Sequence, residues 1–181
     1  VVPPDALGQF PRHGVRLHRP ADLPRRQQDD LRKYFSKNML PVLTPIAVDP
    51  SHPFPALGNC VIQVAVRLRP PDRRRPVHAF VEVPSALPRF VPVAMGAGRQ
   101  DFVLAEELVM GHLDMLFAGC EILDRFAFRL TRDMDFTLDE EGVRDLLVHI
   151  ERKLIHRRRR APIRLELPKG CRGALANWLR A

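Results

Sequence analysis

Arginine is the residue type whose number and spacing in this sequence could do chemistry. The 181 residues contain 29 Lys and Arg against 21 Asp and Glu, and all but four of the basic residues are Arg. They concentrate in two runs, Arg73 to Arg75 and Arg157 to Arg160. Guanidinium groups form forked contacts with phosphate oxygens, and a positive field favours polyanions such as nucleic acid, acidic membranes or polyphosphate. A solvated loop or helix end explains each run equally well.

Other reactive side chains do not form a recognisable catalytic or metal-binding pattern. Cys60, Cys120 and Cys171 are widely spaced, and the seven His do not cluster near them, so no metal site is predicted. Serine is scarce, and no Gly-rich phosphate loop, GxSxG or HExxH motif occurs. The residues therefore predict no catalytic group in this chain.

A polar cluster follows one predicted strand. Thr131, Arg132 and Asp133 lie between the strand over 121–130 and a capping box that opens at Thr137. Polar residues at strand ends are common functional positions, and turn chemistry is the alternative for the aspartate. Arg132, together with Arg157, Arg158, Arg159 and Arg160, is our candidate for contacting a polyanion.

The elements that must position these arginines follow from apolar spacing. Eighteen Pro exclude a long coiled coil, and no apolar run reaches the roughly 18 residues of a spanning helix. Helical spacing and strand alternation then predict four helices and several strands. The predicted helices cover 24–39, 106–117, 137–154 and 173–179. The predicted strands cover 60–68, 77–83, 89–93, 102–104, 121–130 and 163–167.

This order predicts an α+β fold: a mixed, mainly antiparallel sheet covered by helices in a single compact domain. The first two long strands are expected to pair antiparallel, and the strand over 89–93 to lie at an edge because of its proline. Residues 1–22 show no sustained period and are interpreted as a linker, so the domain is placed at 23–181.

Several ordered segments resemble one family, the polyphosphate kinases that make inorganic polyphosphate from ATP. The most specific segment spans residues 41–55 (PVLTPIAVDPSHPFP), preceded by HGVRL at 13–17 and Tyr34-Phe35. The other segments follow in the family's order: FVEVP at 80–84, LPRFV at 87–91, FRLTRD at 128–133 and IRLE at 163–166.

The resemblance implies that residues 1–22 end the family's N-terminal domain and that 23–181 form its head, or middle, domain. It implies a parent phosphotransferase that uses ATP and Mg²⁺ and moves the γ-phosphate to polyphosphate through a phosphohistidine. That histidine belongs to C-terminal catalytic domains without a counterpart here. This chain is therefore expected to be inactive alone and to bind no cofactor.

The resemblance also implies partners and a location. We expect contacts with the remaining domains of the enzyme, a homodimer or higher oligomer, and arginines in a basic polyphosphate tunnel. We expect no specific nucleic acid, no transmembrane segment and a cytoplasmic location, with peripheral contact to the inner membrane face left open. Two other functions remain: an autonomous basic module that binds nucleic acid, or a pure protein-interaction domain whose charge is incidental.

Overall fold

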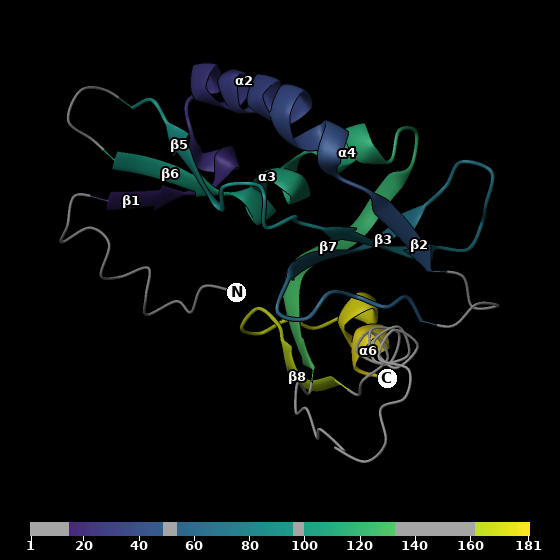
Figure 1. Ribbon diagram of the computed structural model, residues 1–181. Helices are drawn as coiled ribbons and strands as arrows, with labels where there is room; N and C mark the ends of the chain where they lie inside the picture. Colours follow the sequence, from purple (N-terminus) through teal and green to yellow (C-terminus); the bar gives the residue numbers. More distant parts are fainter. Residues whose placement is uncertain (1–14, 49–53, 96–99, 133–161) are drawn as a thin grey trace, which may run out of the picture.

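The computed structural model describes residues 15–48, 54–95, 100–132 and 162–181 (Figure 1). The α-helices are α2 (Arg25–Tyr34), α3 (Ala105–Gly111), α4 (Leu113–Leu116) and α6 (Ala174–Arg180). Short helical turns of other types are η2 (Pro20–Asp22), η3 (Phe35–Met39) and η4 (Leu40–Val42). The strands are β1 (Val15–His18), β2 (Pro45–Val48), β3 (Ile62–Arg69), β4 (Val77–Glu82), β5 (Phe90–Val93), β6 (Gln100–Leu104), β7 (Glu121–Arg132) and β8 (Pro162–Glu166).

A five-stranded sheet with the order β2-β4-β3-β7-β8 forms the centre of the molecule, and every neighbouring pair in it is antiparallel. Its central strand, β3, alternates side chains between two apolar clusters. Val64, Val66 and Leu68 belong to one cluster, whereas Ala65 belongs to the other. Because successive side chains of a strand point to opposite faces, this sheet is covered on both sides.

The larger cluster lies between this sheet, α2 and α3. It contains Leu31 and Phe35 from the first helical region and Leu108 and Val109 from α3, and Phe35, Leu108 and Val109 have no measurable exposure. Figure 1 shows α3 and α4 on one side of the sheet and α6 on the other. The amphipathic pattern predicted for 24–39 is confirmed as α2 continued by η3.

The smaller cluster fixes α6 against the opposite face. Leu175 and Ala176 are fully buried there beside Phe80 and Phe128. The indole of Trp178 stacks on the imidazole of His78 on β4, with ring centroids 3.9 Å apart and planes 9° from parallel. A short helix thereby gains a rigid position through aromatic packing that its own length would not supply.

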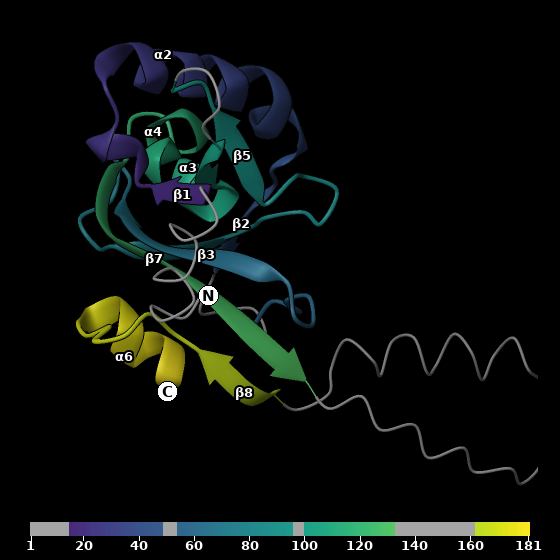
Figure 2. The same cartoon turned by 90° about the vertical axis from the view of Figure 1, so that its left-hand side faces the viewer.

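A second sheet of three strands, in the order β1-β6-β5, packs against the larger cluster (Figure 2). β5 joins this sheet because β4 already pairs on both edges, with β2 and β3. β1 pairs parallel to β6, and His18 Nε2 lies 2.6 Å from the buried carboxylate of Asp101. Residues 15–18 therefore form a strand within the 1–22 stretch, where the sequence predicted no element.

The predicted α+β class and the antiparallel pairing of the first two long strands are confirmed. The strands divide between two sheets instead of one. The helix predicted over 106–117 is interrupted at His112, whose Nδ1 lies 2.9 Å from the carbonyl oxygen of Leu108 and whose ring stacks on Phe35. The predicted helix over 137–154 lies outside the described residues.

A partly buried ion pair joins the small sheet to α3. Arg89 Nη2 donates to Glu106 Oε1 at 2.7 Å, and its Nε donates to the same oxygen at 3.1 Å. The glutamate side chain is 5% exposed, so removal of Arg89 leaves a buried carboxylate without this partner. We expect Arg89→Ala to lower the free energy of unfolding by about 2 kcal/mol in urea denaturation.

A matched control is Arg69→Ala, which removes an ion pair with Glu121 whose side chains are 44% and 60% exposed. Water screens that ion pair, so we expect Arg69→Ala to lower the free energy of unfolding by less than about 1 kcal/mol. Equal destabilisation by the two substitutions would show that burial of Glu106 does not set the strength of the Arg89 contact.

The stacked His78 predicts a pH dependence of stability. Burial, with a smaller contribution from the charge of Arg67, lowers the pKa of His78 below its ordinary value of 6.5. The unfolded chain then binds the proton more readily than the folded chain. The free energy of unfolding should therefore fall as the pH drops below about 6.5 and level off below the folded-state pKa.

Comparison of urea denaturation between pH 5 and 7.5 for the unmodified chain and His78→Phe measures this contribution. Phenylalanine keeps a ring against Trp178 and removes the proton. We expect a shallower pH slope for His78→Phe, and identical slopes would rule out titration of His78 as a source of the dependence.

Candidate functional site

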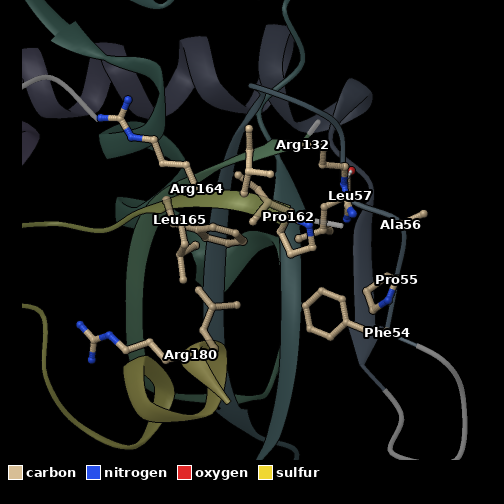
Figure 3. Close-up of a pocket in the computed structure, with 13 residues that line it drawn as sticks. Phe54, Pro55, Ala56, Leu57, Arg132, Pro162, Arg164, Leu165 and Arg180 are labelled. Carbon is tan, nitrogen blue, oxygen red and sulfur yellow. Dashed lines mark hydrogen bonds between the residues drawn. The ribbon is translucent and has the colours of Figure 1, made fainter. Parts of the chain in front are cut away.

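A hollow with a volume of about 1000 Å³ lies between the end of β7, β8, α6 and residues 54–57. Its floor is apolar, and three guanidinium-bearing residues, Arg132, Arg164 and Arg180, stand around it. In Figure 3, Arg164 and Arg180 lie at one side of the hollow, and Arg132 and Phe54 lie at the opposite side. We call this hollow the β7–β8 pocket. The floor is formed by Leu57, Phe128, Leu130, Ile163, Leu165 and Leu179.

Arg132 is positioned by an irregularity at the end of β7. The pairing of β7 with β8 shifts register between Thr131 and Arg132. The backbone N–H of Arg132 donates to Asn59 Oδ1 at 2.7 Å, and its side-chain Nε donates to the carbonyl oxygen of Leu57 at 3.4 Å. These contacts hold the half-buried side chain at the pocket wall.

The turn that receives Arg132 is itself tightly constrained. Cys60 has a φ of +58°, and its N–H donates to the carbonyl oxygen of Leu130 at 2.8 Å. Gly58 has no room for a larger residue, because a Cβ there would lie 2.9 Å from Val61 Cγ2. Hydrogen bonds thus join residues 57–60 to residues 130–132, about 70 positions later in the sequence, at this wall of the pocket.

Arg164 belongs to a short ionic row along β7 and β8. Glu166 accepts from Arg129 Nη2 at 2.8 Å, and its other oxygen lies 3.4 Å from Arg164 Nε. Burial alone would raise the pKa of Glu166, but the hydrogen bond and charge of Arg129, with the charge of Arg164, outweigh burial and lower it. The carboxylate therefore stays ionised at neutral pH, and Arg164 keeps a side chain that is 70% exposed.

Arg180 and Phe54 complete the rim. Arg180 Nη2 donates to the carbonyl oxygen of Cys171 at 3.0 Å, which uses one of the five guanidinium donors. The ring of Phe54 is 5.4 Å from Phe80 and 6.1 Å from Trp178 and remains 52% exposed. The pocket therefore has an aromatic ring and guanidinium groups around an apolar floor.

The structure describes only part of the site predicted from sequence. Arg132 lies in the pocket, whereas Arg157, Arg158, Arg159 and Arg160 lie outside the described residues, as does Asp133. The Arg73 to Arg75 run is exposed between β3 and β4, and Arg73 lines a separate hollow beside His78. The two predicted basic runs are therefore not shown to share a surface.

Sequence reasoning missed Arg164, Arg180 and Phe54. Arg164 alternates with Ile163 and Leu165 along β8, which could have placed it opposite the apolar face. No local signal marks Arg180 or Phe54, because their position depends on how α6 and residues 54–57 pack on the sheet.

In residues 15–48, 54–95, 100–132 and 162–181, no three side chains of His, Cys, Asp or Glu gather where they could share a metal ion, and the three cysteines are free thiols. Within the same ranges, none of the helices has both the length and the apolar character that crossing a membrane requires.

Comparison with known proteins gives a consistent match. Residues 26–181 match the family described as the polyphosphate kinase middle domain. A polyphosphate kinase of Mycobacterium marinum is 40% identical over 169 residues, which are 90% of this chain and 22% of that protein. A polyphosphate kinase of Mycobacterium tuberculosis H37Rv is 38% identical over 173 residues. The chain thus spans about a fifth of the length of these relatives.

The fold comparison agrees with the sequence match. The crystal structure of a polyphosphate kinase from Porphyromonas gingivalis superposes with a TM-score of 0.64 at 28% identity. The match covers 74% of this chain and 21% of the other.

Proposed function

This chain belongs to the polyphosphate kinase family, and on that premise we propose that it serves as the middle, or head, domain of an enzyme that makes inorganic polyphosphate from ATP. Its parent transfers the γ-phosphoryl group of ATP reversibly to the growing polymer through a phosphohistidine. The reacting histidine lies in the remainder of the parent, and the present chain supports the site without an imidazole of its own.

The arginines around the β7–β8 pocket carry the proposal. Arg132 is anchored through Leu57 and Asn59, and Arg164 and Arg180 approach from the other side. Guanidinium groups fixed in advance bind phosphate oxygens without first having to be ordered. We propose that Arg132 forms part of the wall of a polyphosphate tunnel. We assign to the same wall the Arg157 to Arg160 run, which ends two residues before the start of β8.

ATP and Mg²⁺ are proposed as ligands of the parent and not of this chain. Mg²⁺ prefers carboxylate and water oxygens, and the described residues contain no group of three acidic or imidazole side chains that could share it. Three guanidinium groups surround the pocket, and the carboxylate of Glu166 is already hydrogen-bonded to Arg129. These groups do not fit a cation. We therefore assign no step of phosphoryl transfer to these residues.

The proposed partners are the other domains of the parent and a second copy of it, in a homodimer or a larger oligomer. On β8, Ile163 is 66% exposed beside the apolar floor of the β7–β8 pocket, and we propose that another domain or subunit covers this part of the surface. A cytoplasmic location is proposed, in agreement with three cysteines that form no disulfide.

Binding of the polymer tests the role of the arginines. We expect the chain to bind long-chain polyphosphate more tightly than DNA of equal charge at both 50 and 200 mM salt, as measured by competition in fluorescence anisotropy. Arg132→Ala and the double variant Arg157→Ala/Arg158→Ala should each weaken polyphosphate binding about five- to tenfold, because each removes positive charge that would pair with phosphates. Arg69→Ala removes an exposed Arg away from the pocket and is the control.

Two results would count against this role. Equal affinity for DNA and polyphosphate, with the same salt dependence, would favour a nonspecific nucleic-acid module. Polyphosphate binding that is unchanged in the Arg132 and Arg157/Arg158 variants would remove these arginines from the tunnel wall.

Activity provides a separate test. We expect no ATP-dependent polyphosphate synthesis by the 181-residue chain and no phosphorylated histidine in mass spectrometry after incubation with ATP and Mg²⁺. Stable phosphorylation of any of its seven histidines would contradict the assignment of the reacting imidazole to another part of the parent.

A further inference from the structure

The loop that joins β3 to β4 carries three arginines that its own fold does not use. This β3–β4 loop spans residues 70–76 (PPDRRRP), and Arg73, Arg74 and Arg75 are all exposed. Within the described ranges, no hydrogen bond or ion pair involves any of these three guanidinium groups. Three Arg against the one Asp of the loop, Asp72, give it a net charge of +2. The loop is therefore a local source of positive potential.

The β3–β4 loop is shaped before any partner arrives. Three of its seven residues are Pro, and proline fixes φ. The backbone N–H of Arg73 donates to the carbonyl oxygen of Pro70 at 3.2 Å, and at the end of β3 the guanidinium of Arg69 pairs with Glu121 at 2.6 Å. In Figure 1 the loop projects from the right-hand side of the molecule. A partner that binds it has little backbone disorder to remove.

A hollow with a volume of about 430 Å³ lies beside the loop, and Arg73 is one of its lining residues. We call it the hairpin hollow. The imidazole of His78 also lines it and is uncharged at neutral pH, because burial lowers its pKa. The guanidinium groups therefore adjoin a space suited to an apolar side chain. The apolar part of the lining consists of Ala47, Val48, Leu68, Val77, Ala79 and Phe117.

This combination of groups fits an acidic peptide better than other polyanions. Polyphosphate carries charged oxygens along its whole length and has no apolar group to place in the hairpin hollow. A lipid bilayer keeps its apolar chains beneath the headgroups, and none of the large apolar side chains exposed in the described ranges belongs to residues 70–76. A peptide can present carboxylates, which match the forked guanidinium geometry, on either side of one apolar side chain.

We propose that the β3–β4 loop and the hairpin hollow bind an acidic segment of a protein, with carboxylates at Arg73 to Arg75 and one apolar side chain in the hollow. This interaction surface goes beyond the proposed function. The hairpin hollow and the β7–β8 pocket share no lining residue, and the loop requires neither Arg132 nor polyphosphate.

Three fluorescein-labelled peptides test the proposal by fluorescence anisotropy with the 181-residue chain at low salt: EEEELEEEE, EEEEAEEEE and QQQQLQQQQ. We expect EEEELEEEE to bind about fivefold more tightly than EEEEAEEEE, because Leu removes more apolar surface from water than Ala does. It should bind about tenfold more tightly than QQQQLQQQQ, which has no carboxylate for the arginines.

Substitutions assign the two halves of the surface. The triple variant Arg73→Gln/Arg74→Gln/Arg75→Gln should weaken EEEELEEEE binding about tenfold. Ala47→Gln, at an exposed residue that lines the hairpin hollow, should reduce the advantage of EEEELEEEE over EEEEAEEEE. Thermal melts establish that each variant is folded.

The matched control removes the same charge elsewhere. Arg16, Arg25 and Arg26 are exposed on β1 and at the start of α2, away from the β3–β4 loop in Figure 1. Arg16→Gln/Arg25→Gln/Arg26→Gln should therefore leave EEEELEEEE binding within about twofold of the unmodified chain.

Equal affinity for EEEELEEEE and EEEEAEEEE, or an equal loss of binding in the two triple variants, would overturn the proposal in favour of attraction by net charge. Phosphatidylserine vesicles that bind more tightly than EEEELEEEE, and only through Arg73 to Arg75, would overturn it in favour of a membrane surface. Failure of the polyphosphate role is distinguishable, because Arg132→Ala should weaken polyphosphate binding and leave EEEELEEEE binding unchanged.

Discussion

The burial of β3 on both faces is the constraint on which the rest of the structure depends. Val64 and Val66 contact the layer that contains α3, while Ala65 faces Phe80 and the layer that contains α6. A strand in this position cannot shift by one residue without moving both sets of side chains to the wrong face. Its fixed register in turn sets β4 on one edge and β7 on the other, and β7 delivers Arg132 to the pocket.

The two faces of the five-stranded sheet are covered to different extents. The α3 face is a closed core in which Leu108 and Val109 have no measurable exposure. The α6 face is only partly covered, because α6 spans seven residues and leaves Phe54 and Ile163 open. The apolar floor of the β7–β8 pocket lies on this α6 face.

Local patterns in the sequence predicted most helices and strands, because an element that buries one face repeats its apolar residues at a regular spacing. The alternation of residues 60–68 and the four-residue spacing of Leu31, Phe35 and Met39 each required one side to be buried. The four residues of β1 (VRLH) also alternate apolar and polar side chains, but so short a run did not stand out, and its pairing with β6 is what shows it to be a strand. The same limit applies to the site. Arg132 was recognisable at the end of a predicted strand, whereas Arg180 and Phe54 became neighbours through the packing of α6 and of residues 54–57.

The parallel pairing of β1 with β6 has a consequence for biosynthesis. His18 and its partner Asp101 are 83 residues apart in the chain. At a ribosomal speed of about 5–20 residues per second, β1 leaves the ribosome roughly 4–16 s before the segment that completes it. During that interval it is an unprotected edge that could join the wrong neighbour, and its short length and the outward charge of Arg16 are features that discourage such association.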